Sequence, residues 1–287
     1  MTDKYAVIGN PIAHSKSPLI HGIFAKQTGQ NISYEAILAP LDGFAATIER
    51  LRKEGYKGCN VTVPFKFEAF KIATQLTERA KAAQAVNTLK FDGDTILGDN
   101  TDGAGLVRDI EHNLGISLQG KRVLLMGSGG AAYGVALPLW RSGGKLMAVS
   151  RDPEKARLLI EKTGMLDSYM LDEGMLDGSV AISTQHVLHT SYTGLTSHQF
   201  DIIINATSTG LTDEMPPLPP GIFAPGALAY DMMYGRETPF MRFAREQGAQ
   251  VADGLGMLVE QAAEAFLIWR GVRPDTAPVI AKLRETA

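Results

Sequence analysis

Cysteine is almost absent from this sequence, and neither sign of charge is in large excess. The one cysteine among 287 residues, Cys59, cannot form a disulfide within the chain. A single thiol fits a reducing compartment, so we expect a cytoplasmic protein. The formal net charge of −3 gives no electrostatic reason to expect nucleic acid or an anionic membrane surface as a partner.

Long hydrophobic runs are also missing. No apolar stretch approaches the ~20 residues that span a bilayer. The N-terminal stretch MTDKYAVIGNP lacks the charged segment and the apolar run of a secretory signal. We therefore expect neither a membrane span nor an export signal.

What the chain does contain is an ordinary globular composition, with 45% hydrophobic and 21% charged residues. Its length suggests about two domains. Strand-like and helix-like segments alternate through most of it, which predicts an α/β fold with mainly parallel sheets. In the first part we expect strands at 5–9, 32–38, 58–63 and 85–91, helices at 17–28, 43–54 and 66–83, and a connecting helix at 102–114.

A second series of strands and helices begins near residue 121. We expect strands at 121–126, 145–150, 201–206, 227–234 and 250–253, and helices at 130–142, 153–163 and 254–272. The stretch 165–200 mixes serine, threonine and histidine, and we place a strand there only loosely, near 180–183.

The second series opens with a glycine turn, GSGGAA at 127–132, which follows a buried strand and starts a helix. Gly127 and Gly129 allow a tight turn and a close approach of the backbone to a diphosphate, and Ala132 leaves room for the helix to pack on the strand. The phosphates would lie at the helix N-terminus, against free N–H groups. This context predicts a dinucleotide site.

The end of the next strand indicates which dinucleotide. A site for NAD usually has an acid there to accept from the ribose hydroxyl, whereas this chain has Arg151, with Lys155 one turn later. Two cations suit a 2′-phosphate, so NADP is favoured over NAD. The alternative is that both are solvated surface charges, and the neighbouring Asp152 weakens the argument for a phosphate.

Polar side chains gather in the loops of the first part. Ser15 and Ser17 precede a helix that begins near Pro18, where two hydroxyls can bind a carboxylate, although Ser17 can equally be an N-cap. In NVTVPFK, Pro64 ends a strand and Lys66 follows at once. Asp102 stands at a helix start, where capping is again the simpler interpretation.

A lysine and an aspartate that meet can serve a proton transfer. An ammonium beside a carboxylate is held charged, so Lys66 needs burial or a neighbouring cofactor to lower its pKa before it acts as a base. The sequence alone does not establish that Lys66 and Asp102 meet.

Motifs along nearly the whole chain resemble the shikimate dehydrogenase family. They are GNPIAHSKSPLIH, NVTVPFK, AVNT, GDNTDGAG, GSGGA, NATSTG, YDMMYG and GLGMLVEQAAEAFLIW. The resemblance implies an N-terminal α/β substrate domain joined to a Rossmann dinucleotide-binding domain, with the C-terminal helices returning to the first. The substrate domain would comprise 1–103 and 254–287, and the NADP domain 104–253. The implied reaction is the reversible reduction of 3-dehydroshikimate to shikimate with NADPH.

The resemblance also implies residue roles. Lys66 and Asp102 form the catalytic pair, with Lys66 as proton donor and Asp102 orienting it. The substrate-binding residues it implies are Ser15, Ser17 and Tyr234 at the carboxylate, with Asn60, Thr62, Asn87 and Gln261 toward the ring hydroxyls. The cofactor-binding residues it implies are Gly127, Ser128, Gly129, Gly130, Ala131, Ser150, Arg151, Lys155, Asn205, Ala206, Thr207 and Gly254. No metal is expected, and we expect a monomer or a homodimer.

The chain departs from the family pattern at a few positions. Gly22 replaces an asparagine, Gln84 replaces a glycine, Tyr133 replaces a basic residue, and Ser150 begins a Ser-Arg-Asp run in place of Asn-Arg-Thr. These changes leave open a quinate/shikimate dehydrogenase or a diverged paralogue with weak shikimate activity. Two serines in the first loop favour shikimate, because the additional C1 hydroxyl of quinate needs room beside the carboxylate. A non-catalytic sensor is a further alternative, though it has little need of both Lys66 and Asp102.

Overall fold

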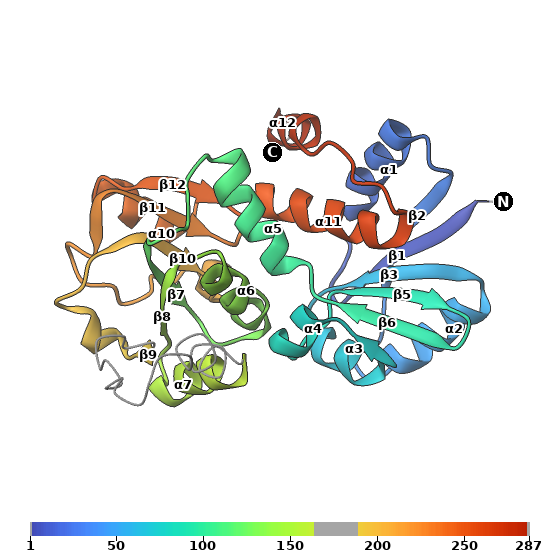
Figure 1. Cartoon of the computed structure of the whole chain (residues 1–287), viewed down its shortest axis with the longest axis horizontal. Coiled ribbons are helices and arrows are strands. Elements are labelled where there is room, and N and C mark those ends of the chain that lie inside the picture. Colours follow the sequence, from blue (N-terminus) through green and yellow to red (C-terminus); the bar gives the residue numbers. More distant parts are fainter. Residues whose placement is uncertain (1, 164–188, 286–287) are drawn as a thin grey trace, which may run out of the picture. The chain divides into compact units, whose positions relative to one another are not determined.

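A computed structural model of the chain describes residues 2–163 and 189–285. The chain forms two compact units (Figure 1). The first comprises Met1–Leu114 and Gly256–Ala287, and the second comprises Gly115–Leu255. Each unit has a sheet flanked by helices, so the predicted α/β fold is confirmed. The predicted strand near 180–183 lies outside the described residues.

The first unit contains a sheet in the order β2-β1-β3-β5-β6-β4. The strands β1, β2 and β3 are parallel, whereas β5 is antiparallel to both β3 and β6. Their bounds are β1 Asp3–Gly9, β2 Ile32–Leu38, β3 Tyr56–Val61, β4 Gln75–Leu76, β5 Thr88–Asp92 and β6 Thr95–Asp99.

Helices cover both faces of this sheet (Figure 1). The helices of the unit are α1 Ser17–Thr28, α2 Phe44–Lys53, α3 Lys66–Ile72, α4 Glu78–Ala83, α5 Asp102–Arg108, the π-helical turn η1 Asp109–Asn113, α11 Leu255–Arg270 and α12 Ala277–Glu285. On one face, α2 and α3 bury a core that includes Phe44, Ile48 and Phe65.

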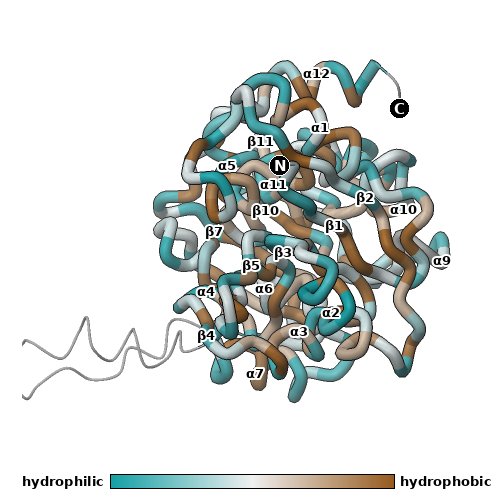
Figure 2. The backbone as a smooth tube through the Cα atoms, turned by 90° about the vertical axis from the view of Figure 1, so that its right-hand side faces the viewer, coloured by the Kyte–Doolittle hydropathy of each residue, from teal (hydrophilic) through white to brown (hydrophobic). Residues whose placement is uncertain are grey.

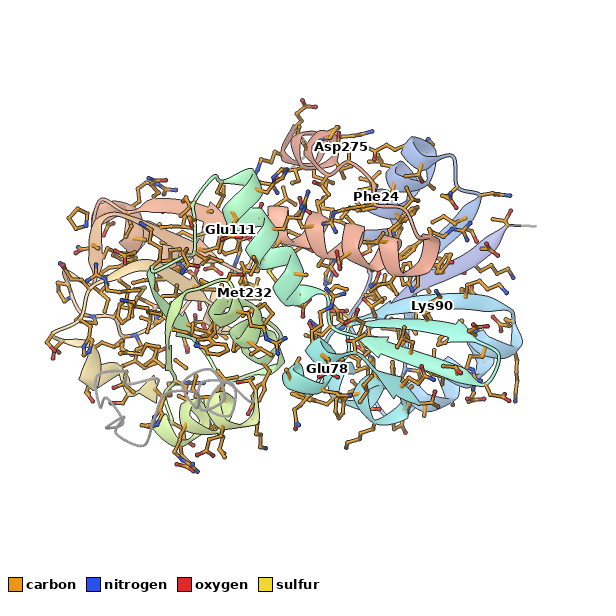
Figure 3. All side chains as sticks on the ribbon, viewed as in Figure 1. Phe24, Glu78, Lys90, Glu111, Met232 and Asp275 are labelled. Atoms are coloured by element: carbon orange, nitrogen blue, oxygen red, sulfur yellow. The ribbon has the colours of Figure 1, made fainter. Side chains whose placement is uncertain are left out.

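The opposite face of the same sheet is covered by α1 and α11. Tyr5 of β1 stacks on Trp269 of α11, with ring centroids 4.6 Å apart. Phe24 points from α1 toward α11 (Figure 3) and meets Phe266 edge to face. The last turn of α11 is also tied to β5, because the ammonium of Lys90 donates to the carbonyl of Ile268 at 3.1 Å. The C-terminal helix α11 is thus part of the first unit.

The second unit contains a parallel sheet in the order β12-β11-β10-β7-β8-β9. The strands are β7 Arg122–Met126, β8 Lys145–Val149, β9 His189–Thr190, β10 Phe200–Asn205, β11 Phe223–Asp231 and β12 Gln250–Asp253. The helices are α6 Gly130–Arg141, α7 Pro153–Lys162, the 3-10 turn η2 Tyr192–Leu195, α9 Thr209–Thr212 and α10 Pro239–Glu246. The helices α6 and α7 pack on one face of the sheet, and α10 packs on the other.

Hydropathy follows this layering (Figure 2). The tube is hydrophobic along β1 and β10, whose central residues are buried, and largely hydrophilic along α2, which lies at the surface. Among the described residues, no helix is long and apolar enough to cross a bilayer.

One predicted helix, 66–83, is wrong. Residues 66–83 form α3, then the strand β4, then α4. Ala73 leaves the helical conformation at ψ 129°, and Gln75–Leu76 pairs with β6 instead. The strand β6 itself, α10 and α12 were not predicted. The predicted helix 102–114 is α-helical only to Arg108, after which it widens into η1.

Gln84, which stands where the family has a glycine, ends α4 in the left-handed conformation with φ +50°. This is a conformation that glycine adopts without a steric penalty.

Candidate active site

The site in the first unit forms where three strands meet at one edge of the sheet. Asn60 of β3 is paired with Thr88 of β5, and Thr88 is paired with Asp99 of β6. Because β5 runs antiparallel to both neighbours, its start lies beside the carboxyl ends of β3 and β6. The segments that follow or precede these strand ends are therefore brought together, namely 60–66, 87–88 and 99–102.

Lys66 and Asp102 meet at this edge. Lys66 is the first residue of α3 and Asp102 is the first residue of α5. The ammonium of Lys66 lies 2.5 Å from Oδ2 of Asp102, and the two side chains are 18% and 8% exposed. The strand β3 ends at Val61, earlier than the expected end at Pro64, and a turn at 63–65 leads into Lys66. The main-chain carbonyl of Lys66 accepts from the amide of Val86 at 3.0 Å. The structure thus places a partly desolvated ion pair here.

Asn87 holds the other oxygen of the Asp102 carboxylate. Its Nδ2 donates to Oδ1 of Asp102 at 2.7 Å and to Oγ1 of Thr101 at 3.0 Å. Its Oδ1 accepts from the main-chain amide of Thr101 at 2.9 Å and from the hydroxyl of Thr88 at 2.9 Å. Since both ends of this buried amide are used, its orientation is fixed, and it fixes the carboxylate in turn.

Gln261 reaches the same group from α11. Its Oε1 lies 3.3 Å from the hydroxyl of Thr101 and 3.5 Å from Nδ2 of Asn87, and its Nε2 donates to the carbonyl of Leu258 at 2.9 Å. Thr101 was missed by the sequence analysis. Its position inside the GDNTDG motif, next to Asp102, was the available signal.

Asn60 is occupied on both sides. Its Oδ1 accepts from the hydroxyl of Tyr34 at 2.7 Å, and its Nδ2 donates to Thr88 at 3.0 Å and to the carbonyl of Asn87 at 3.3 Å. Its contribution to the site is therefore to hold Thr88 and Asn87 in place. A direct contact of Asn60 with substrate stays a prediction.

Beside Tyr34 lies a buried histidine that the sequence analysis did not consider. The ring of His21 stacks on Tyr34 with centroids 4.2 Å apart and also contacts Phe24 and Trp269. Neither of its ring nitrogens has a hydrogen-bond partner in the part of the chain that the structure describes. Burial among these rings lowers the pKa of His21 to about 3, and the nearby Asn60 only partly opposes this.

The two serines lie at the start of α1. Ser17 is the first helical residue and is 6% exposed, and its main-chain amide donates to the hydroxyl of Ser15 at 3.3 Å. Lys16 rather than Ser17 holds the N-cap position. Thr62 follows β3, and its main-chain amide donates to the carbonyl of Ile8 at 2.9 Å. Tyr234, the remaining predicted substrate residue, belongs to the second unit and is half-buried.

In the second unit, β7, the glycine turn and α6 follow one another as predicted. Gly127 has φ +113°, and a Cβ there would come within 2.9 Å of the carbonyl oxygen of Ala206, so only glycine fits. Gly129 is exposed and is the N-cap of α6, and apart from its chain neighbours no described atom lies within 4 Å of where its Cβ would be. Ser128 precedes it in the turn, Gly130 and Ala131 begin α6, and all three are half-buried. These features fit a bound diphosphate.

The predicted basic pair follows β8. Arg151 and Lys155 are both exposed. Asp152 caps α7, because its Oδ1 accepts from the amide of Glu154 at 3.1 Å. Its carboxylate is thus engaged by a helix N-terminus. Ser150 is buried and donates to the main-chain carbonyl of Asp152.

The residues predicted to line the nicotinamide side form a hydrogen-bonded loop after β10. Oδ1 of Asn205 accepts from the amide of Thr207 at 3.1 Å, and its Nδ2 donates to Asp231 at 3.1 Å. Asp231, which the sequence analysis missed, is fully buried, and burial raises its pKa. Gly254 lies so close to Met232 that a Cβ would come within 2.2 Å of its carbonyl oxygen.

Comparison with known proteins decides the family. The chain is 56% identical over 284 residues to a protein of Methylobacillus flagellatus named shikimate dehydrogenase (NADP(+)), covering 98% of this chain and 99% of that one. The chain belongs to the shikimate dehydrogenase family. Two family profiles also match: the shikimate dehydrogenase substrate binding domain at residues 7–89 and the shikimate 5′-dehydrogenase C-terminal domain at residues 254–284.

Solved structures with the same fold include two that are similar in sequence to this chain. The crystal structure of an Ael1 enzyme from Pseudomonas putida superposes with a TM-score of 0.86 at 47% identity, covering 98% of each chain. A shikimate 5-dehydrogenase from Thermus thermophilus, in complex with NADP(H) and shikimate, superposes with a TM-score of 0.84 at 29% identity, covering all of both chains.

Proposed function

We propose that this protein is an NADP-dependent shikimate dehydrogenase, which reversibly reduces 3-dehydroshikimate to shikimate. The contact of Lys66 with Asp102 carries the proposal, because it sets an ammonium and a carboxylate side by side among buried hydrogen-bonding groups. The names of the relatives support the same reaction, and so does the shikimate in the Thermus thermophilus complex.

Lys66 supplies the proton of the reduction. The reaction adds one hydride to a ketone carbon and one proton to its oxygen. Lys66 gives that proton to the oxygen, and in the reverse direction takes it from the hydroxyl. Asp102 holds the ammonium in place through Oδ2, while Asn87 holds Oδ1. When bound, NADPH supplies the hydride.

The other polar residues bind the substrate. Ser15 and Ser17 bind the carboxylate, and Thr62, Asn87 and Gln261 bind the ring hydroxyls. We infer that the first unit serves as the substrate domain and the second as the cofactor domain. Residues 104–114, which the family resemblance assigned to the cofactor domain, lie in the first unit.

The cofactor is held by the glycine turn and by the residues that follow β8. The N-terminus of α6 faces the diphosphate, and Arg151 and Lys155 bind the 2′-phosphate. The residues Asn205 to Thr207 line the nicotinamide side. We infer a cytoplasmic protein on the basis of the single cysteine, and we expect a monomer or a homodimer.

An assay of two substrates with two cofactors tests this function. Shikimate and quinate are each offered with NADP and with NAD, and reduced nicotinamide is followed by its absorbance. We expect the highest kcat/KM with shikimate and NADP. A higher kcat/KM for quinate identifies a quinate/shikimate dehydrogenase instead, and no turnover of shikimate at millimolar concentration contradicts the proposal.

A further inference from the structure

Two helices of the first unit carry residues of the candidate site and cross each other. Asp102 begins α5, and Gln261 lies in the second turn of α11. Their side chains are linked through the amide of Asn87, which lies 2.7 Å from Asp102 and 3.5 Å from Gln261. The distance between the two helices therefore sets how these three groups meet.

Gly105 occupies the crossing, one turn after Asp102. A Cβ at this position would lie 2.7 Å from the main-chain nitrogen of Gln261 and 2.9 Å from the main-chain carbonyl oxygen of Met257. Outside its own residue, chain neighbours and helix backbone, a real Cβ atom essentially never comes within 3.0 Å of another heavy atom. Since both obstacles are backbone atoms, a rotamer change cannot relieve the collision, and α11 must move.

The crossing is also held closed on the far side of Gly105. Nε of Arg108 in α5 lies 3.0 Å from Oε2 of Glu260 in α11, which is an ion pair without hydrogen-bond geometry. Glu260 is fully buried and accepts from Arg273 at 2.8 Å and from Thr276 at 2.6 Å. The helices therefore cannot separate freely, and added volume at Gly105 is transmitted to its nearest neighbour, Gln261.

A shift of α11 would break the side-chain contacts of Gln261. Its Oε1 lies 3.3 Å from the Thr101 hydroxyl and 3.5 Å from Asn87, which is the outer limit of a hydrogen bond. We propose that Gly105 is a positioning residue. By allowing α11 to approach α5 closely, it holds the Gln261 side chain where its amide binds a ring hydroxyl of the substrate. This inference rests on the proposed function.

The test compares Gly105→Ala with Gly22→Ala. Both glycines are in helices of the first unit, but a Cβ at Gly22 would have no described atom within 4 Å apart from its chain neighbours and the backbone of its own helix. We expect Gly105→Ala to raise the KM for shikimate at least fivefold while the KM for NADP changes less than twofold. Gly22→Ala should leave both constants unchanged. A merely structural defect lowers the amount of active enzyme, and thus the apparent kcat, without raising the KM.

A double-mutant cycle with Gln261→Ala identifies the route of the effect. If Gly105 acts through Gln261, Gly105→Ala raises the shikimate KM less than twofold once Gln261 is already alanine. Fully multiplicative effects, or an unchanged KM in Gly105→Ala, overturn the inference. Wild-type protein that does not turn over shikimate refutes the proposed function instead, so the two failures are distinguishable.

If Gly105→Ala does not fold, the variant Arg108→Gln tests the same inference. This change loosens the same helix pair without adding volume, and Glu260 keeps Arg273 as a partner. We expect a twofold to fivefold rise in the KM for shikimate with that for NADP unchanged. An unchanged KM for shikimate in Arg108→Gln then overturns the inference.

Discussion

At the scale of single residues, the orientation of the Asp102 carboxylate is fixed from both sides. Lys66 holds Oδ2 and Asn87 holds Oδ1, and Asn87 is itself held by Thr88 and Thr101. Residue types and motifs were enough to select Lys66, Asn87 and Asp102 from the sequence. Thr88 and Thr101, which hold the Asn87 amide, were not selected. Serine and threonine are common throughout the sequence, and only the strand pairing shows which of them lie beside that amide.

The lysine should contribute to turnover far more than to binding. Replacing Lys66 by alanine removes the proton donor, and general acid–base groups typically contribute ~10²–10⁴-fold to rate. We expect kcat to fall by about that factor while the Kd for shikimate, measured by calorimetry, changes much less. A lower affinity with turnover retained would assign Lys66 a purely binding role.

Arg151 should determine the preference between the two cofactors. A charged hydrogen bond to a phosphate contributes ~1.5–3 kcal/mol, so Arg151→Ala should raise the KM for NADP roughly 10- to 150-fold. The KM for NAD, which lacks the 2′-phosphate, should change little. Steady-state kinetics with both cofactors measure this difference, and equal effects would show that Arg151 does not contact the 2′-phosphate.

His21 should make the stability of the protein depend on pH. Its pKa is about 3 in the folded state and 6.5 in a model peptide, so between these values the unfolded chain binds a proton that the folded chain does not. The free energy of unfolding therefore falls as the pH drops below 6.5, with a slope of up to ~1.4 kcal/mol per pH unit.

A variant without an ionisable group at position 21 separates the contribution of His21 to this pH dependence from those of the other ionisable groups. We expect His21→Phe to flatten the dependence of the unfolding free energy on pH between about 6 and 4, as measured by urea denaturation. His14→Gln, at an exposed position, serves as the matched control and should keep the wild-type slope. The same slope in all three proteins would show that His21 is protonated in the folded state.

At the scale of elements, the sequence predicted the regular strands and helices well. The bounds of α1 and β2 are as predicted, because Pro18 and Gly29 mark one element and alternating residues mark the other. The failure at 66–83 has a physical cause. The stretch has helix-forming residues and no glycine or proline, yet Gln75–Leu76 pairs with β6, which was itself overlooked. The two-residue loop Gly93-Asp94, a hairpin signal, could have revealed β6.

An ion pair between a half-buried arginine and a buried aspartate holds the elements around that missed strand. Arg79 of α4 binds Asp99 at the end of β6 through Nε at 2.9 Å and Nη2 at 2.6 Å, and it binds Glu264 of α11 through Nη1 at 2.9 Å. The Asp99 side chain is only 3% exposed. Oδ1 of Asp99 also accepts from the amide of Asn100, two residues before Asp102.

Removing one partner of this pair should be costly, whereas removing both should not. Arg79→Met leaves a buried carboxylate without its cation, and we expect the free energy of unfolding to fall by ~3–5 kcal/mol. Adding Asp99→Asn neutralises that carboxylate and should recover at least half of the loss. Urea denaturation measures both changes, and a double variant no more stable than Arg79→Met would refute this account.

At the scale of the whole molecule, the first unit is built from both ends of the chain. Arg270 is paired with Asp3 at 2.5 Å, and the indole of Trp269 donates to the carbonyl of Leu89 at 3.0 Å. Periodicity predicted the helix at 254–272 but not where it packs, because such contacts join residues far apart in sequence. Its return to the first unit was inferred from the family resemblance alone.

Each unit has its own core and one of the two tryptophans, Trp140 in α6 and Trp269 in α11. Single-tryptophan variants can therefore follow the units separately. Trp140→Phe leaves a fluorescent reporter in the first unit, and Trp269→Phe leaves one in the second. If the proposed sites are assigned to the correct units, each ligand should stabilise mainly the unit that binds it.

We expect shikimate to raise the denaturation midpoint reported by Trp269, and NADP to raise that reported by Trp140. A ligand at 100 times its Kd stabilises the state that binds it by ~2.7 kcal/mol, which is enough to separate the two transitions. Sodium chloride at the same ionic strength is the control for screening of surface charges. Equal shifts of both transitions with either ligand would show that the molecule unfolds as one cooperative body, because stabilisation of one unit would then be shared by the other.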